Sequence, residues 1–154
     1  MHPSVNILVV DDDRMIADLL KEYLSGRGHA VTTVYSGREA LAALCGGKFS
    51  IVIVDMKMPD VDGMAVLERV KKTDRDTVVI MITGYGTLDS AVAAINHGAY
   101  DFIAKPFQLE EFEIVIRRAI QRHRSLKQLG LYRRLFWLSV VLSLILIGLL
   151  FRFF

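Results

Sequence analysis

Cysteine is nearly absent from this sequence of 154 residues, which contains Cys45 alone and so cannot form an internal disulfide. We interpret Cys45 as a packed thiol, because no metal-ligand spacing surrounds it. The first residues, Met1 to Asn6, lack the pattern of a signal peptide. A reducing cytoplasm is therefore the expected compartment for the polar part of the chain. A glycine-rich phosphate loop is also missing, which argues against an ATP site.

Acidic residues are missing from the last part of the chain. All 17 lie at or before Glu113, whereas eight lysines and arginines follow from Arg117 onward. Up to Ile116 there are 11 basic residues against 17 acidic ones, a net charge of −6 within a chain of +2. The acidic part should therefore bind a cation or a basic partner, and the basic part anionic lipid. Because the basic part has no helix-turn-helix pattern, we expect no nucleic acid partner.

Charge is also absent from residues 135–151, where only two serines and a glycine are not strongly apolar. A helix of this length measures ~26 Å at ~1.5 Å per residue, close to the ~30 Å hydrocarbon core of a bilayer. We predict a single transmembrane helix over 135–154. The basic segment 126–134 before it is predicted to be a juxtamembrane linker or a continuation of a preceding helix. The excess of positive charge on that side predicts an inner-membrane protein whose polar domain lies in the cytoplasm.

A coiled coil is the alternative for this tail, because a three-four spacing of leucine and isoleucine runs from Leu135 to Leu149. Positions outside that stripe, including Phe136 and Val141, are apolar as well, which favours a membrane. Ser139 and Ser143 form a weak small-residue pattern that leaves a homodimer possible.

The rest of the chain alternates strand-like and helix-like patterns. Apolar runs occur at residues 5–10, 30–34, 51–54, 78–82 and 100–104. Helix-like stretches of about a dozen residues separate them, which predicts a parallel sheet covered by helices on both faces. We predict the α/β doubly wound, flavodoxin-like order 2-1-3-4-5, with 30–34 at an edge because it contains two threonines. The last helix should begin near Leu109 and reach Gly130, the expected boundary before the tail.

Polar side chains end four of the five predicted strands. Asp11 and Asp12 follow the first strand, Asp55 ends the third, and Thr83 and Lys105 follow the fourth and fifth. In the predicted order these residues meet at one rim of the sheet. Three carboxylates there repel one another unless a cation lies among them, and Mg²⁺ is the hard cation that is commonly shared with phosphate.

This set of residues suits phosphoryl transfer. A carboxylate can act as a nucleophile toward phosphorus, while a lysine and a threonine hydroxyl can bind the transferred group. Asp13, the third acid of the first cluster, is predicted to cap the following helix rather than bind metal. The histidines lack ligand-like spacing and are predicted to lie at the surface: His2, His29, His97 and His123.

Over roughly residues 4–125, these motifs resemble the receiver domain of two-component response regulators. The matching segments are Val9-Val10-Asp11-Asp12-Asp13, Val54-Asp55-Met56-Lys57-Met58-Pro59, Thr83-Gly84 and Lys105-Pro106-Phe107. The resemblance implies a receiver domain over 1–125 in which Asp55 accepts a phosphoryl group from a phosphohistidine. It implies that Asp11, Asp12, Asp55 and the backbone carbonyl of Lys57 form a magnesium site. It also implies that Thr83 and Phe102 act as switch residues, and that the bond before Pro106 is cis.

Together, the resemblance and the tail predict a membrane-tethered, single-domain response regulator. Its partners would be a sensor histidine kinase or histidine phosphotransfer protein, and a downstream protein that recognises the phosphorylated surface. It would not be a conventional enzyme, because it would catalyse only its own phosphorylation and dephosphorylation. Three alternatives remain at this point: a phosphorelay intermediate or phosphate sink, the N-terminal receiver of a longer transcriptional regulator, and a degenerate receiver that is never phosphorylated.

Overall fold

The computed structural model describes residues 4–84 and 88–153, which form a five-stranded sheet and five helices. All neighbouring strands are parallel, in the predicted order β2-β1-β3-β4-β5. The strands are β1 (Asn6–Val10), β2 (Ala30–Val34), β3 (Ile51–Asp55), β4 (Val78–Thr83) and β5 (Asp101–Ala104). The helices are α1 (Arg14–Ser25), α2 (Gly37–Gly46), α3 (Gly63–Thr73), α4 (Leu88–Asn96) and α5 (Leu109–Phe153).

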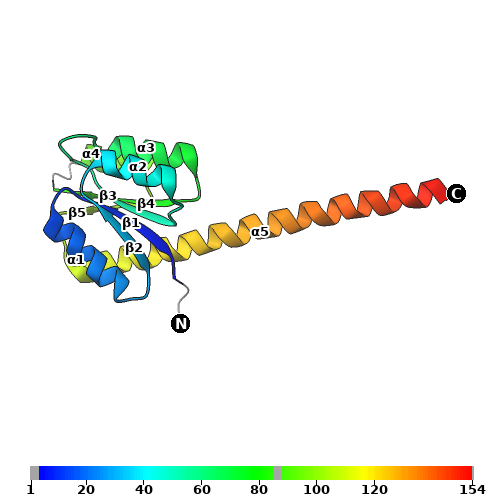
Figure 1. Ribbon diagram of the computed structural model, residues 1–154, viewed down its shortest axis with the longest axis horizontal. Coiled ribbons are helices and arrows are strands. Elements are labelled where there is room, and N and C mark those ends of the chain that lie inside the picture. Colours follow the sequence, from blue (N-terminus) through cyan, green and yellow to red (C-terminus); the bar gives the residue numbers. More distant parts are fainter. Residues whose placement is uncertain (1–3, 85–87, 154) are drawn as a thin grey trace. The chain divides into compact units, whose positions relative to one another are not determined.

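Two apolar layers hold the sheet between the helices. Figure 1 shows α2, α3 and α4 on one face of the sheet, and α1 with the first turns of α5 on the other. Alternate residues of each central strand point to opposite faces, so that Ile53 joins the layer under α1 and α5 while Val52 and Val54 join the other. Strands β3 and β4 are therefore buried throughout, whereas the edge strand β2, with its threonines, is more exposed, as predicted.

Side-chain caps begin three of the helices. Asp13 accepts a hydrogen bond from the backbone N–H of Met15 at the start of α1, which confirms its predicted capping role. Ser36 caps α2 and Asp62 caps α3 in the same manner. Each cap follows a strand directly or closes the loop after one, so these polar residues determine where the chain turns from strand to helix at the rim.

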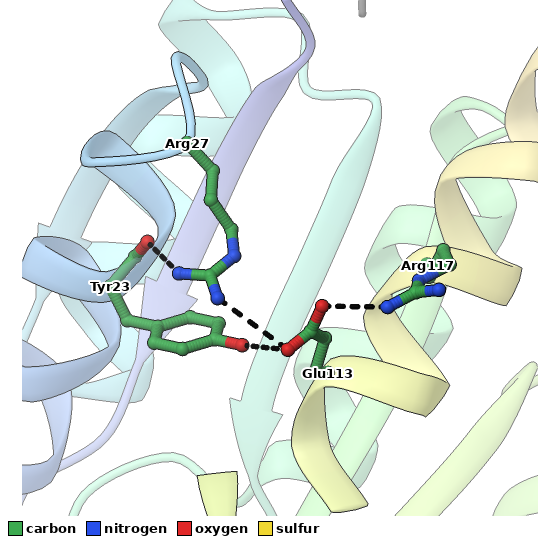
Figure 2. Close-up of polar contacts among 4 residues, drawn as sticks. All are labelled: Tyr23, Arg27, Glu113 and Arg117. Atoms are coloured by element: carbon green, nitrogen blue, oxygen red, sulfur yellow. Dashed lines mark hydrogen bonds and ion pairs between the residues drawn. The ribbon is translucent and has the colours of Figure 1, made fainter. Parts of the chain in front are cut away.

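A polar cluster joins α1 to the beginning of α5 (Figure 2). The hydroxyl of Tyr23 donates to Glu113 Oε2 at 2.9 Å, and Arg117 donates to Oε1 of the same carboxylate at 2.6 Å. Arg27 lies over the Tyr23 ring, 3.6 Å from its centroid, and reaches Glu113 at 3.5 Å. The hydrogen bond from Tyr23 and the neighbouring arginines lower the pKa of Glu113. One oxygen of this carboxylate, Oε2, thus joins α5 to α1 and to Arg27, while the other is held by Arg117 one turn further along α5 itself.

The chain divides into two compact units, Met1–His123 and Arg124–Phe154. Gly130, the expected boundary, does not end a helix, because α5 runs unbroken to Phe153. A single glycine costs a helix only about 1 kcal/mol, which the surrounding good helix formers offset. Within the described part of the chain, one helical segment, Leu109–Ile145, is long and apolar enough to cross a membrane as judged by length and composition alone.

Two surface assignments from the sequence are wrong. Cys45 is exposed rather than packed, because it lies at the end of α2 on the side that faces solvent, with Sγ 3.7 Å from Arg69 of α3. His123 is buried rather than exposed, at 6% of its full accessibility. It follows Ala119 by one helical turn and shares the buried side of α5, a position that the basic sequence around it concealed. His97 is exposed and His29 partly so, while His2 lies outside the described residues.

Candidate functional site

Three aspartates meet at the carboxyl edge of the sheet, where the strand order reverses between β1 and β3. Asp11 and Asp12 follow β1, and Asp55 is the last residue of β3. One carboxylate oxygen from each lies within 4.8 Å of the others. Asp11 and Asp55 are buried, at 1% and 5% exposure, whereas Asp12 is exposed. The predicted cluster is therefore present, with one side open to solvent.

Lys105 enters the cluster from the end of β5. Its Nζ lies 2.7 Å from Asp11 Oδ2 and 3.4 Å from Asp55 Oδ1, so one ammonium group bridges both buried carboxylates. Its backbone N–H donates to the Thr83 carbonyl oxygen at 2.7 Å, which aligns the ends of β4 and β5. The peptide bond between Lys105 and Pro106 is cis, as expected.

Burial sets the electrostatics of this cluster. It raises the pKa of Asp55 to about 6 from an ordinary 3.8, with Lys105 opposing and the neighbouring aspartates adding to the rise. Burial also raises the pKa of Asp11, against the hydrogen bond and charge of Lys105. Burial by itself lowers the pKa of Lys105, but the hydrogen bond and charge of Asp11 and the charge of Asp55 outweigh it and raise that pKa. The lysine therefore stays charged while one positive group faces three carboxylates.

The single ammonium group of Lys105 cannot balance three ionised carboxylates, and one oxygen of each carboxylate lies near the same point, where all three could bind a cation. Oxygen donors of this kind are the ones that Mg²⁺ prefers. The residues present therefore fit a magnesium ion. The loop after β3 carries Lys57, the fourth predicted ligand, two residues beyond Asp55; it is exposed between the buried Met56 and Met58.

The predicted switch residues lie on the neighbouring strands β4 and β5. Thr83, the last residue of β4, is buried at 1% exposure. Phe102 in β5 is partly buried and packs against the apolar layer under α2, α3 and α4. Thr83 adjoins the aspartate cluster through the strand register, because its neighbour Ile82 pairs with Asp55, whereas Phe102 pairs with Met81 two residues earlier in β4. Their movement on phosphorylation stays a prediction.

Gly63 lies unusually close to the end of β3. A Cβ atom at this position would lie 2.1 Å from the carbonyl oxygen of Asp55, and the Gly63 N–H donates to the Met56 carbonyl at 2.9 Å. Met56 N–H in turn donates to Ile82 O of β4 at 2.7 Å. The beginning of α3 therefore packs directly on the backbone of Asp55, which explains why a glycine follows the loop.

Sequence reasoning missed a second role in this loop. Asp60, which belongs to none of the motifs described above, accepts hydrogen bonds from the backbone N–H groups of Gly37 and Arg38 at 3.1 and 3.0 Å. These hydrogen bonds, with that from Arg38 the largest contribution, lower the pKa of Asp60 to about 2. The contact joins residues 23 and 22 positions apart, and no local spacing rule indicates it.

Residues 7–117 match the model of the response regulator receiver domain. The chain belongs to this family. Receiver domains are phosphoacceptor switches of two-component signalling rather than classical enzymes, and their phosphodonor is a kinase. This membership agrees with the observed sheet order and accounts for aspartates on β1 and β3 facing a lysine on β5.

The receiver domain resembles those of several transcriptional regulators. It is 37% identical over 134 residues to the C4-dicarboxylate transport transcriptional regulatory protein DctD of Rhizobium meliloti, covering 87% of this chain and 29% of that protein. It is also 37% identical over 122 residues to the DNA-binding transcriptional regulator NtrC of Salmonella typhimurium, covering 79% and 26%. The chain thus spans less than a third of the length of these two relatives.

Solved structures also match the receiver fold of this chain. NtrX from Brucella abortus superimposes with a TM-score of 0.77 at 36% identity, over 83% of this chain and 30% of that one. The CheY-like receiver domain protein from Methanospirillum hungatei superimposes with a TM-score of 0.76 at 31% identity, over 80% and 98%. The receiver fold is therefore matched both in a longer regulator and in a structure that contains little else.

Proposed function

We propose that the chain is a phosphoacceptor switch in which Asp55 receives a phosphoryl group from a phosphohistidine of a sensor histidine kinase or phosphotransfer protein. The observation that carries this proposal is the convergence of three carboxylates and Lys105 at the carboxyl edge of the sheet. Asp11, Asp12, Asp55 and the Lys57 carbonyl would hold Mg²⁺, which supplies positive charge against the incoming phosphoryl oxygens.

The chain's own residues then perform the transfer. A carboxylate oxygen of Asp55 forms a bond to phosphorus as the bond from phosphorus to the donor imidazole breaks, and the imidazole takes up a proton. Lys105, already charged and within 3.4 Å of Asp55, contributes a cation beside the new phosphoryl group. The Thr83 hydroxyl donates a hydrogen bond to that group, and Phe102 moves inward to fill the space that Thr83 leaves. The surface formed by α4, β5 and α5 changes as a result and is read by a downstream protein.

Intact-protein mass spectrometry tests the acceptor. The full chain is incubated with acetyl phosphate and Mg²⁺, alongside Asp55→Asn, a no-metal sample, and Asp76→Asn as a matched exposed aspartate at the opposite edge of the sheet. We expect one added phosphoryl mass in the parent and in Asp76→Asn, and none in Asp55→Asn or without metal. A folded parent that gains no mass would identify a degenerate receiver that only binds partners.

We further propose that the end of α5 anchors the protein in a membrane. Leu135, Phe136, Trp137 and Leu138 are consecutive and each is at least 53% exposed. Successive helical residues are rotated by ~100°, so four in a row present apolar groups on every side of the helix. A coiled coil needs only one apolar seam, whereas lipid surrounds a helix. Arg124 and Lys127 precede this segment on the side expected to face the cytoplasm.

Flotation of the purified full chain with liposomes distinguishes the two structures for the tail. We expect the parent to float and to resist extraction by alkaline carbonate. Leu138→Lys combined with Leu142→Lys should abolish flotation, because two charges in the hydrocarbon core cost several kcal/mol. Leu19→Lys, which changes an exposed leucine on α1, serves as the control. A parent that stays in solution as a crosslinkable oligomer would favour the coiled coil.

A second function is favoured by the relatives, which are transcriptional regulators several times as long as the aligned segment. In this alternative the receiver domain controls an output domain carried on the same polypeptide. Sequencing the gene across the codon for Phe154 tests it: an open reading frame that continues would support the alternative, and a stop codon would support the tethered single domain. A relay or sink role would show instead as phosphate passing from Asp55 to a phosphotransfer histidine, without any stable complex of the phosphorylated form.

A further inference from the structure

The loop between β3 and α3 is tied to the beginning of α2 by one side chain. Asp60 Oδ1 accepts from the Gly37 N–H at 3.1 Å and Oδ2 from the Arg38 N–H at 3.0 Å. The next N–H of the helix, that of Glu39, donates to Ser36 Oγ at 3.1 Å. The first three amides of α2 therefore have acceptors, two of which come from a loop that is distant in sequence.

The two segments are also packed without space between them. A Cβ atom at Gly37 would lie 2.1 Å from the carbonyl oxygen of Val61, so the loop rests directly on the backbone of α2. Val61 and Met58 pack into the apolar layer on the same face of the sheet. Asp60 thus joins the loop to α2 by hydrogen bonds, while Met58 and Val61 on either side of it hold the loop by apolar contacts. Together these contacts determine the path of the loop.

The same loop carries the predicted metal ligand Lys57. Its ends are fixed by Met56 N–H, which donates to Ile82 O, and by Asp62, which caps α3. Between these ends, the proposed magnesium site requires the Lys57 carbonyl to point toward the aspartates. Outer contacts of this kind orient the groups that touch a metal, and their removal typically weakens metal binding by about 10- to 100-fold.

We propose that Asp60 is a positioning residue for the magnesium site, acting by tying the Lys57 loop to the first turn of α2. The inference rests on the proposed site formed by Asp11, Asp12 and Asp55. Without the Asp60 carboxylate, the loop adopts further conformations in which the Lys57 carbonyl points away from the aspartates. Part of the free energy of metal binding is then used to order the loop. Because Met58 and Val61 keep their apolar contacts, we expect the lower end of the range, about a tenfold weaker Mg²⁺ affinity.

The test measures Mg²⁺ binding directly by isothermal titration calorimetry of the full chain in a nonionic detergent. Asp60→Ala is compared with the parent, with Asp60→Asn, which keeps one acceptor oxygen but not the charge, and with Asp76→Ala, which removes an exposed carboxylate at the opposite edge of the sheet. We expect Asp60→Ala to raise the Kd about tenfold, Asp60→Asn to raise it less than threefold, and Asp76→Ala to leave it unchanged.

Hydrogen exchange of the Gly37 and Arg38 amides in metal-free protein provides a second measurement that does not depend on the metal. Protection of both amides should fall in Asp60→Ala and persist for at least one of them in Asp60→Asn. Unchanged protection, or equal Kd values for the parent and Asp60→Ala, would overturn the inference while leaving the acceptor role of Asp55 intact. An Asp60→Asn variant that keeps the protection of one amide yet binds Mg²⁺ as weakly as Asp60→Ala would also overturn it, since the effect would then be one of charge. A parent that binds no Mg²⁺ would overturn the proposed site itself.

Discussion

Replacement of Asp55 by asparagine should stabilise the metal-free fold at neutral pH. The pKa of Asp55 is raised from 3.8 to about 6, chiefly by burial, so the ionised carboxylate is disfavoured in the native state. A shift of about two pKa units corresponds to roughly 3 kcal/mol of unfolding free energy. Asparagine has almost the same shape and no charge. Asp55→Asn is therefore expected to be more stable than the parent by up to about 3 kcal/mol at pH 7.

The pH dependence follows from the same shift. Between pH 4 and 6 the native state holds the proton on Asp55 more tightly than the unfolded chain does, so the parent loses stability as the pH rises through that window. Below about pH 4 the carboxyl group is protonated in both states and this penalty disappears. The advantage of Asp55→Asn should therefore be full above about pH 6 and vanish near pH 4.

Urea unfolding with EDTA present, followed by near-ultraviolet circular dichroism of the packed tyrosines, measures this difference. With Mg²⁺ present the parent should be more stable than Asp55→Asn, because the ion binds the native parent, whereas the variant lacks one of the carboxylate ligands. Asp76→Asn is the control and should follow the parent at every pH. An Asp55→Asn variant that is no more stable at pH 7, or equally favoured at pH 4 and 7, would refute the electrostatic argument.

Three further substitutions test other contacts. Lys105→Met should slow phosphorylation by at least about 100-fold, because the transferred phosphoryl group loses a neighbouring cation. It should also lower the stability of the metal-free protein at pH 7, because the buried carboxylates lose their positive partner. Added Mg²⁺ should raise the urea midpoint of this variant more than that of the parent. Tyr23→Phe should lower the unfolding free energy at pH 7 through loss of its hydrogen bond to Glu113, and by less as the pH falls through the lowered pKa of that carboxylate. Gly63→Ala should cost roughly 3 kcal/mol, since its Cβ would collide with the carbonyl of Asp55, and urea unfolding measures it.

Each of these predictions has a result that contradicts it. For Lys105→Met it is a metal-free stability equal to that of the parent. For Tyr23→Phe it is a loss that grows on acidification, because the lowered pKa of Glu113 means that the contact stabilises the fold only while this carboxylate is ionised. For Gly63→Ala it is an unchanged midpoint, with Gly46→Ala as the control because nothing lies within 4 Å of a Cβ there.

The sheet was predictable because its signals are local and mutually consistent. The apolar runs at 51–54 and 78–82 match β3 and β4 to within one residue at each end. The strand order was predicted as the common doubly wound one, with 30–34 at an edge because it contains two threonines. The aspartate cluster was predictable for the same reason, because parallel strands deliver their carboxyl ends to one edge.

The errors concern features that depend on three-dimensional neighbours. Asp60 binds α2 through a loop path that neither segment encodes alone. The exposure of Cys45 and the burial of His123 depend on which side of a helix faces the sheet, and both residues lie near the ends of amphipathic patterns where that side is hardest to assign. Gly130 does not interrupt α5, since helix propensity is a weak local preference that its neighbours override.

The close approach at Gly37 and Gly63 has a consequence for how this sequence can vary. At both positions a single added carbon would lie 2.1 Å from a backbone oxygen, that of Val61 in the loop after β3 for Gly37 and that of Asp55 at the end of β3 for Gly63. Backbone cannot move aside as a flexible side chain can, so even alanine displaces the chain at Asp55 in one case and at Val61 in the other. A deep mutational scan should therefore show two positions of near-complete intolerance that carry no functional group. Their tolerance profiles should match that of a catalytic residue, although neither glycine has a side chain that could take part in the chemistry.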